Sequence, residues 1–490
     1  MATKTQTTAY EAVIGMEVHA ELMTESKMFC RCAVVDLTTA QPNTAVCPVC
    51  LGMPGVLPVI NQQAIEYGIM VGLALNCEIA AFNQFARKNY FYPDLPKGYQ
   101  ISQYEFPLAV NGYVMIDLPD GSAKRIGIRR AHLEEDTGKN THLSDGTSLV
   151  DFNRSSVPLL EIVTEPDIHS AEEAEAYCRK LRAILQYLGV NSGDMSKGVL
   201  RVEANISVRP VGSSEFRNRT EVKNLNSIRN MFRATEYEIQ RQIEVWESGG
   251  SVVQETRGWD EQKQKTFSQR SKESAHDYRY FPEPDLPVLE ISRDWVERVN
   301  AHMPELPDTK RERFMTNLGL NPYDASVLVA DRPIADYFEA AVKAGGEAKT
   351  VANWMMGELF RLMNKSGLER EQINEISVKP EQLVEVIKLI EKKTINNNAG
   401  KKVLEIVYNK GGEVSTIIHS EGLAQQSDEG VLRNAIVQVL DQNPGEVVRW
   451  LNGEEKVIKF LMGQVMRAMR GTGDAQAVQR LLEEELSKRK

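Results

Sequence analysis

The sequence of 490 residues lacks several features that would assign a chain to a common class at once. It has no run of eighteen apolar residues, which is about the length that a membrane-spanning helix needs. Its first eight residues are polar, so we expect no secretory signal and a cytoplasmic protein. We find no internal repeat of solenoid period and no low-complexity tract. The composition is that of an ordinary globular protein, and the length predicts more than one domain.

The familiar nucleotide-binding and hydrolytic motifs are also missing. No Gly-x-x-x-x-Gly-Lys-Ser/Thr string occurs, which excludes a P-loop. No dinucleotide fingerprint follows a predicted strand, because Gly471-Thr-Gly473 lies in a helical region and is interpreted as a turn. No His-Glu-x-x-His string occurs either. Gly249-Gly250-Ser251 is the only trace of a Gly/Ser-rich nucleophile loop, and it is typical of a helix end.

Acidic residues outnumber basic ones, and cysteine is scarce. The net charge of −10 argues against adhesion to nucleic acid by bulk charge, although it is compatible with local basic patches and a selective RNA partner. Only six cysteines occur, and four of them lie between positions 30 and 50. Without an export signal, such a cluster predicts a metal site in a reducing compartment rather than disulfides. Cys77 and Cys178 stand alone, and we expect both in the core.

The four clustered cysteines have the spacing of a zinc knuckle. Cys30-x-Cys32 is followed, after fourteen residues, by Cys47-Pro-Val-Cys50-Leu-Gly52. The proline shapes the turn, Gly52 lets the backbone approach the sulfur atoms, and two such pairs complete a tetrahedral site. The alternative is four small buried apolar residues. Because four thiolates leave no open position, we predict a structural Zn²⁺ rather than a catalytic one.

A second set of candidate ligands is spread over the first half of the chain. Glu17 and His19 lie two apart in a predicted strand, so their side chains share one face and offer oxygen and nitrogen to a hard cation. Further glutamates follow in strand-like segments, at Glu134, Glu135, Glu161, Glu203 and Glu221. Each of these glutamates alone is more simply interpreted as solvent-facing, with the exception of Glu161.

Glu161 stands out because Leu160 and Ile162 flank it, which predicts a partly buried carboxylate. A buried anion needs a partner. Two anions about 4 Å apart repel by roughly 4 kcal/mol at an effective dielectric constant of about 20, and a divalent cation would turn that repulsion into binding.

An aromatic and basic segment runs from Arg87 to Tyr104, and the string Tyr278-Arg-Tyr-Phe-Pro282 has the same character. Aromatic rings stack on unpaired bases and lysines hold phosphates, which favours contact with RNA. A tyrosine-rich loop packed on a sheet has the same composition. The residues alone leave both interpretations open.

The hydrophobic periodicity changes near residue 293. Before it, strand-like alternation, frequent turn signals and two helical segments, near 170–189 and 225–247, predict an α+β fold with a large, mainly antiparallel sheet. After it, the pattern is helical almost throughout, including one amphipathic helix over 351–360 and three apolar stripes near the end. We expect domains at 1–292, 293–410 and 411–490. Basic residues in or just before the last domain are Lys401, Lys402, Lys456, Lys459, Arg467 and Arg470.

Taken together, several long strings resemble the B subunit of the tRNA-dependent amidotransferase. They are Ile-Gly-Met-Glu-Val-His-Ala-Glu-Leu from residue 14, Arg-Lys-Asn-Tyr-Phe-Tyr-Pro-Asp-Leu-Pro-Lys-Gly-Tyr-Gln-Ile-Ser-Gln from 87, His-Leu-Glu-Glu-Asp-Thr-Gly-Lys from 132, Glu-Val-Lys-Asn-Leu-Asn-Ser from 221 and Asp-Tyr-Arg-Tyr-Phe-Pro-Glu-Pro-Asp-Leu-Pro from 277. The resemblance implies a cradle-shaped catalytic domain, a helical domain and a tail domain that grips tRNA.

The resemblance also implies a reaction, that of a carbon–nitrogen ligase with glutamine as amide donor. ATP and Mg²⁺ would phosphorylate the side-chain carboxylate of Glu-tRNA(Gln), Asp-tRNA(Asn) or both, and ammonia would displace the phosphate. An amidase subunit would release the ammonia from glutamine, and a small C subunit would complete a heterotrimer. The sequence itself agrees with a separate amidase, because it carries no amidase-like Ser/Lys signature.

Residue by residue, the resemblance assigns the magnesium to Glu17, His19, Glu135 and Glu161, with Glu134 a close alternative to its neighbour. Lys88, Glu203 and Glu221 would line the same cavity and contact ATP, with Lys88 also acting in catalysis. Without a P-loop, ATP has to be held by sheet residues and metal. Two other hypotheses are a metallohydrolase that works without ATP and a non-catalytic tRNA-binding adaptor.

Overall fold

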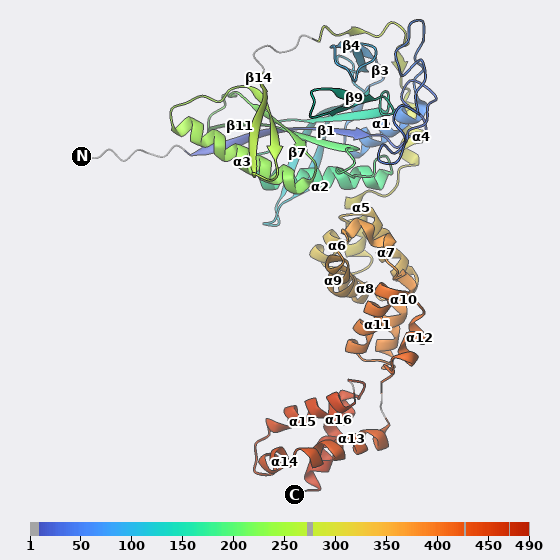
Figure 1. Ribbon diagram of the computed structural model, residues 1–490, viewed down its shortest axis with the longest axis vertical. Helices are drawn as coiled ribbons and strands as arrows, with labels where there is room; N and C mark the ends of the chain where they lie inside the picture. Colours follow the sequence, from blue (N-terminus) through green and yellow to red (C-terminus); the bar gives the residue numbers. More distant parts are fainter. Residues whose placement is uncertain (1–8, 272–277, 426–427, 470, 490) are drawn as a thin grey trace, which may run out of the picture. The chain divides into compact units, whose positions relative to one another are not determined.

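The computed structural model describes residues 9–271, 278–425, 428–469 and 471–489. The chain forms two compact units, Met1–Pro307 and Asp308–Lys490. The described residues of the first contain the sheets and four helices, and the second is helical wherever it is described (Figure 1). The predicted α+β class is therefore confirmed. Among the described residues, no helix has the length and apolar character required to cross a membrane.

A nine-stranded sheet forms the centre of the first unit, with β1 (Tyr10–Glu21) in its middle. Its neighbours pair antiparallel throughout, except for the parallel pair β12/β13. The order is β14 (Lys265–Ser271), β13 (Glu255–Asp260), β12 (Thr220–Leu225), β11 (Leu200–Pro210), β1, β10 (Pro158–Thr164), β7 (Ala123–Glu135), β6 (Ala109–Asp117) and β2 (Glu78–Ile79).

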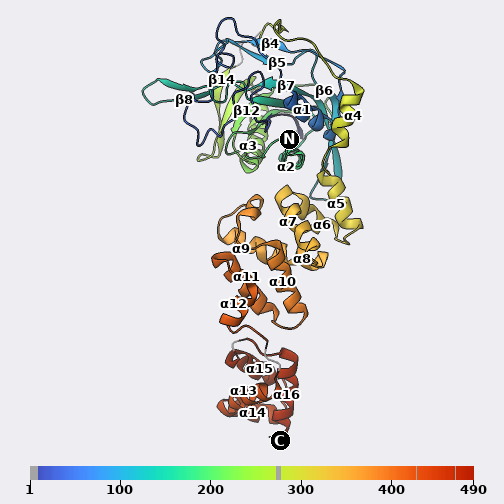
Figure 2. The ribbon, with the colours of Figure 1, turned by 90° about the vertical axis from the view of Figure 1, so that its right-hand side faces the viewer.

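The two faces of this sheet differ sharply. Helices α1 (Gln62–Ala74), α2 (Ala171–Leu188) and α3 (Ile228–Glu247) cover one face, as Figure 2 shows, and share its hydrophobic core. Along β1, Met16, Val18 and Ala20 point into that core. Because side chains alternate along a strand, Glu17 and His19 point to the opposite face. The sheet thus presents polar residues on the side opposite these helices.

The predicted helices near 170–189 and 225–247 are confirmed as α2 and α3, with local capping that explains their limits. The hydroxyl of Ser170 accepts the backbone N–H of Glu173 at the start of α2, and Gly189 ends that helix with φ 71°. Ser227 caps α3 in the same way, accepting from the backbone N–H of Asn230. A serine at the N-cap and a glycine in the left-handed region at the end are the expected residues.

Smaller sheets lie beside the large one. They are β15 (Phe281–Pro282), β4 (Ala86–Asn89) and β5 (Tyr99–Ser102) in one sheet, β16 (Leu289–Glu290) with β3 (Phe82–Asn83), and β8 (Lys139–His142) with β9 (Ser148–Asp151). The proline-rich stretch after Phe281 thus pairs back onto the first unit, and the carboxylate of Glu283 accepts two hydrogen bonds of 2.7 Å from Arg87. Helix α4 (Arg293–Ala301) packs against the same core, so this unit continues past residue 292 to Pro307.

The second unit consists of short helices. In order they are α5 (Pro307–Thr316), α6 (Pro322–Val329), α7 (Arg332–Lys343), α8 (Ala348–Trp354), the π-helical turn η1 (Met355–Leu359), α9 (Phe360–Lys365), the 3₁₀ turn η2 (Arg370–Glu375), α10 (Pro380–Glu391), α11 (Asn397–Lys410), α12 (Val414–Ser420), α13 (Glu429–Gln442), α14 (Pro444–Leu451), α15 (Val457–Ala468) and α16 (Ala475–Ser487). The helix predicted over 351–360 is therefore interrupted by a π-turn.

The last helices of this unit, α13 to α16, share a hydrophobic core of their own, which buries Leu432, Leu461 and Leu482. These leucines come from the three apolar stripes seen in the sequence. Helix α11 ends at Lys410, where Gly411 takes φ 68°. The division of the unit at 410/411 stays a prediction. Arg470, one of the predicted basic residues, lies outside the described residues.

Candidate functional site

Strand register brings the scattered acidic residues together on the polar face of the sheet. His19 of β1 lies opposite Glu161 of β10, which in turn lies opposite His132 of β7. On the other side of β1, Glu17 lies opposite Glu203 of β11. Directly opposed residues on one face have neighbouring Cβ atoms, so the four strands place these charged side chains in two adjacent rows, His132–Glu161–His19 and Glu17–Glu203.

His19, Glu134 and Glu161 form the first group, which we call the histidine–glutamate cluster. Each offers one ligand atom within 4.8 Å of the others. The Nε2 atom of His19 lies 3.5 Å from a Glu161 oxygen and 3.8 Å from a Glu134 oxygen. His132 joins them, with Nε2 3.4 Å from Glu161. Sequence reasoning missed His132, although its spacing of two from Glu134 in a strand was the available signal.

The imidazole of His19 partly offsets the negative charge in this cluster. Burial lowers the pKa of His19, but the hydrogen bond and charge of Glu161, with the charges of Glu203 and Glu134, outweigh it and raise that pKa to about 9. Burial raises the pKa of Glu161, and the two imidazoles outweigh that effect and hold it well below its ordinary value. Nδ1 of His19 and of His132 is buried without a hydrogen-bond partner in the described part of the chain.

Glu17, Glu203 and Glu221 form the second group, the glutamate cluster, again with ligand atoms within 4.8 Å. The ammonium of Lys223 lies 2.8 Å from Glu203 and 3.3 Å from Glu221. The side-chain amide of Asn205 donates to Glu17 at 2.9 Å. The pKa of Glu17 is raised, first by burial and then by the charges of Glu161, Glu203 and Glu221. Glu17 therefore couples the two clusters electrostatically.

Lys88 reaches the same region from β4 of the small sheet. Burial lowers the pKa of its ammonium, but Glu134, Tyr280 and Glu161 outweigh burial and raise that pKa above its ordinary value. The side chain is thus a fixed positive charge between the histidine–glutamate cluster and the aromatic residues near Tyr280.

Glu135 does not join either cluster. Its carboxylate accepts a hydrogen bond of 2.8 Å from the Lys97 ammonium and one of 2.9 Å from the backbone N–H of Ile101. Adjacent residues of a strand point to opposite faces, which is why Glu134 and Glu135 separate. The geometry favours Glu134 as the ligand beside His19 and Glu161, and the role predicted for Glu135 stays a prediction without geometric support.

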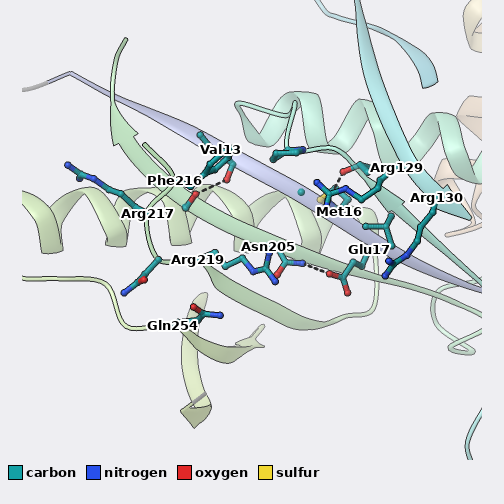
Figure 3. Close-up of a pocket in the computed structure, with 16 residues that line it drawn as sticks. Val13, Met16, Glu17, Arg129, Arg130, Asn205, Phe216, Arg217, Arg219 and Gln254 are labelled. Carbon is teal, nitrogen blue, oxygen red and sulfur yellow. Dashed lines mark hydrogen bonds between the residues drawn. The ribbon is translucent and has the colours of Figure 1, made fainter. Parts of the chain in front are cut away.

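A cavity of about 570 Å³ opens over Glu17 and Asn205 (Figure 3). Four arginines line it, Arg129 and Arg130 from β7 and Arg217 and Arg219 from the segment before β12. Nε of Arg130 and Nη1 of Arg217 are buried, with no hydrogen-bond partner among the residues described. Buried donors on cations without acceptors indicate a site for an anion. No motif in the sequence pointed to these arginines, because the fold assembles them from two distant segments.

The four cysteines lie in the loop region after β1. Their sulfur atoms all lie within 4.8 Å of one another, none is in a disulfide, and the cluster could hold a metal ion such as zinc. The backbone N–H of Cys47 donates to Cys50 Sγ at 3.1 Å. Gly52 has φ +64°, and a Cβ there would lie 2.5 Å from Cγ of Lys97, so the turn requires glycine. Cys77 and Cys178 are buried in the core, as predicted.

Lys27 supplies an independent test of whether this cluster suits a cation. Its side chain has no exposed surface, and its ammonium donates to Cys50 Sγ at 3.7 Å and to the carbonyl of Phe152 at 3.2 Å. A buried ammonium is costly without an anion. Four thiolates on one divalent cation carry a net charge of −2, which matches such a neighbour. The donor set and its surroundings therefore fit a zinc–thiolate centre.

Comparisons with known proteins agree on one family. A family model described as the GatB/GatE catalytic domain matches residues 12–297, and one described as the GatB domain matches residues 336–486. The chain belongs to the GatB/GatE family. Among its relatives, the B subunit of the aspartyl/glutamyl-tRNA(Asn/Gln) amidotransferase of Thermodesulfovibrio yellowstonii is 56% identical over 96% of this chain and 98% of its own length. The proteins of the same name from Caldicellulosiruptor saccharolyticus and Moorella thermoacetica are 53% and 52% identical over 98% and 97% of this chain, and 99% and 100% of their own lengths.

Membership of the GatB/GatE family confirms the resemblance that the long strings predicted. The match to the catalytic domain contains the histidine–glutamate cluster, the glutamate cluster, the arginine-lined cavity and the four cysteines.

Proposed function

We propose that this chain is the B subunit of a tRNA-dependent amidotransferase and carries the ligase site. The observation that supports this most directly is the joining, through Glu17, of two carboxylate clusters beside an arginine-lined cavity. Such an arrangement suits a reaction between two anions, a nucleotide triphosphate and a carboxylate, whose repulsion has to be offset.

The residues present fit magnesium. His19, Glu134 and Glu161 form one ligand set, and Glu17, Glu203 and Glu221 form another that is all carboxylate. Oxygen-rich sets of this kind suit hard divalent cations. When bound, magnesium would offset the charge on the phosphates and on the acceptor carboxylate. Protonated His19 balances Glu134 and Glu161 in the structure as it stands, and it would yield that role to the cation.

The arginines of the cavity would hold the phosphates of ATP. Arg130 and Arg217 have buried donors without acceptors among the described residues, and Arg129 and Arg219 stand beside them. Phe216, 70% exposed on the cavity wall, offers an apolar face to the base. The γ-phosphoryl group would pass to a carboxylate oxygen of the substrate with ADP as leaving group. Ammonia would then attack the acyl carbon and expel phosphate.

Lys88 would stabilise the charge that develops during these two steps. Lys88 belongs to the small sheet, and its ammonium interacts electrostatically with Glu134 and Glu161. The ammonia would come from glutamine hydrolysed on a partner amidase subunit, with a small C subunit in the same complex. The substrates would be Glu-tRNA(Gln), Asp-tRNA(Asn) or both, which are the tRNAs that the names of the relatives print. The cysteine cluster would hold one structural zinc ion.

The reconstituted complex with its partner subunits tests this proposal. We expect ATP-dependent conversion of charged tRNA to the amide form, with glutamine as nitrogen source. Hydrolysis of a substrate without ATP, with no amide formed, would point to the metallohydrolase. Amidation that persists at the wild-type rate in each of the variants Glu17→Gln, His19→Ala and Glu161→Gln would favour the tRNA-binding adaptor.

We also propose that helices α13 to α16 bind tRNA. They share their own core, and Lys456, Lys459 and Arg467 lie on or next to α15 in an otherwise acidic chain. Truncation before residue 411 should raise the KM for charged tRNA and flatten the dependence of log affinity on log salt by about 0.7–0.9 for each lost phosphate contact. Unchanged affinity and slope in the reassembled complex would remove this role from the tail.

A further inference from the structure

Two tyrosine rings from distant segments stack beside the proposed ligase site. The centroids of Tyr104 and Tyr280 lie 4.2 Å apart, and their planes differ by 9°. Tyr104 follows β5, and Tyr280 directly precedes β15. Tyr104 is 51% exposed, so the stack is open to solvent on one side. Phe106 and Phe281, both partly exposed, border it and line a small hollow with the two tyrosines.

The backbone near Tyr280 is held without help from its ring. The side-chain amide of Asn89 donates to the carbonyls of Tyr278 and Arg279, and the backbone N–H of Asn89 donates to Tyr278 as well. Phe281 then pairs with Arg87 of β4. The half-buried ring of Tyr280 is therefore not needed to fix the chain.

Two cations flank the stack and join it to the rest of the site. The guanidinium of Arg130 lies 5.9 Å from the centroid of Tyr104, and Arg130 also lines the arginine-lined cavity. The ammonium of Lys88 lies 5.1 Å from the ring centroid of Tyr278, whose ring contacts that of Tyr280. Burial lowers the pKa of the Lys88 ammonium, and the charges of Glu134 and Glu161 raise it. The stack is thus linked to the arginine-lined cavity through Arg130 and to the histidine–glutamate cluster through Lys88.

An open aromatic surface between cations has the chemistry that binds an unpaired nucleotide. Bases stack on aromatic rings, and cations hold the adjoining phosphates. ATP already has the arginine-lined cavity, with Phe216 exposed on its wall. The other nucleotide of the reaction is the last one of the tRNA, because the amino acid is esterified to its ribose. Its base has to lie close to the side-chain carboxylate that reacts at the cluster.

We propose that the Tyr104–Tyr280 stack is the platform for the unpaired terminal base of the aminoacyl-tRNA. Lys88 and Arg130 would then face the phosphate and ribose of that end. The inference rests on the proposed function and adds to it a positioning surface for the substrate. The stack would hold the ester-linked amino acid so that its carboxylate points to Glu134 and Glu161.

Leucine variants of the two tyrosines test this surface. Tyr104→Leu and Tyr280→Leu should each raise the KM for charged tRNA about 5- to 100-fold, the usual range for loss of one stacking contact. The KM for ATP should stay within about 2-fold of wild type, and Tyr104→Phe should restore tRNA binding. Phe267→Leu, which changes another exposed aromatic residue of the first unit, is the matched control and should have no effect.

A second measurement changes the RNA and uses the wild-type complex first. A stem-loop RNA with the single-stranded end of the tRNA, and the same RNA with an abasic last nucleotide, compete with charged tRNA for the wild-type complex. The abasic RNA should bind about 5- to 100-fold more weakly. The Tyr104→Leu complex should bind the two RNAs with equal affinity, because removing the ring and removing the base abolish the same stacking contact.

Three results would overturn the proposal. A rise in the KM for ATP alone would assign the stack to the base of ATP. Equal competition by the two RNAs at the wild-type complex would show that the base is not bound. Unchanged KM values in both leucine variants would show that the two tyrosines only pack against each other and do not bind substrate. Failure of the proposed function is distinct, because the wild-type complex would then not amidate charged tRNA with ATP at all.

Discussion

The cysteine cluster and the histidine–glutamate cluster both bring potential metal ligands within 4.8 Å of one another, yet they are built in opposite ways. The cysteines come from one loop region between positions 30 and 50, and their four sulfur atoms complete a coordination sphere. The other cluster takes one residue from each of three strands and offers three ligand atoms, and the nearby Glu17 lines a cavity. A closed soft site suits structure, and an open hard site suits chemistry.

The two sites also balance their charge differently. Lys27, which has no exposed surface, stands permanently against Cys50. In the histidine–glutamate cluster, the positive charge is a proton on His19, whose pKa Glu161 helps to raise to about 9. A proton can be exchanged for a cation and an ammonium on a buried side chain cannot. If the proposed function holds, the first site would be occupied permanently, and the second would take a cation that arrives with the substrate.

The largest effect should come from the open site. Glu161→Gln keeps the shape of the side chain and removes the charge that His19 and His132 face. We expect amidation to fall at least about 100-fold, as for loss of a key electrostatic group in other active sites. The glutaminase activity of the amidase partner should remain detectable. The measurement is ATP-dependent amide formation on charged tRNA by the reconstituted complex.

Glu78→Gln, an exposed glutamate at the edge of the same sheet, serves as the control and should leave the rate unchanged. Near-normal amidation by Glu161→Gln would remove Glu161 from the ligase site and erase the functional difference between the two clusters.

The same contrast explains what the sequence could predict. The cysteine pairs could be recognised because a metal knuckle is local, and the spacing alone identifies all four candidate ligands. Glu17 and His19 could be recognised as a pair, because they share one strand. The register that sets His19 against Glu161 and His132 is a property of three strands far apart in the sequence, and no local pattern contains it. The choice between Glu134 and Glu135 depended on strand facing, which the structure supplies.

Glu134 and Glu135 provide a second, smaller test within one strand. Glu134→Gln should raise the Mg²⁺ concentration for half-maximal amidation about 10- to 100-fold, because it removes a charge next to His19 and Glu161. Glu135→Gln should leave that concentration unchanged, because its carboxylate faces Lys97 on the other side. Magnesium titrations of the two complexes check the difference, and the reverse outcome would return the ligand role to Glu135.

The closed site should respond in metal content and stability rather than in chemistry. Cys47→Ser should lower the zinc bound per chain and loosen the loop. A structural zinc contributes about 10–16 kcal/mol in small peptides, and we expect a smaller loss in a large unit with its own core. Cys178→Ser, a buried cysteine outside the cluster, is the control and should keep full zinc. Native protein without zinc by metal analysis would end this assignment.

The smallest effect concerns Lys27 and separates metal affinity from folding. Lys27→Met removes a buried ammonium, and loss of a residue that touches a metal ligand typically weakens metal binding about 10-fold or more. Zinc release to a chelator should therefore be about 10-fold faster.

The same change should leave thermal stability in excess zinc close to wild type, because replacing a buried charge by an apolar side chain is often neutral. Lys310→Met, at a buried lysine paired with Glu339, should keep the wild-type rate of zinc release. If Lys27→Met releases zinc no faster than wild type, the ammonium does not stabilise the thiolates. The two clusters would then differ only in their ligands, and not in the way their charge is balanced.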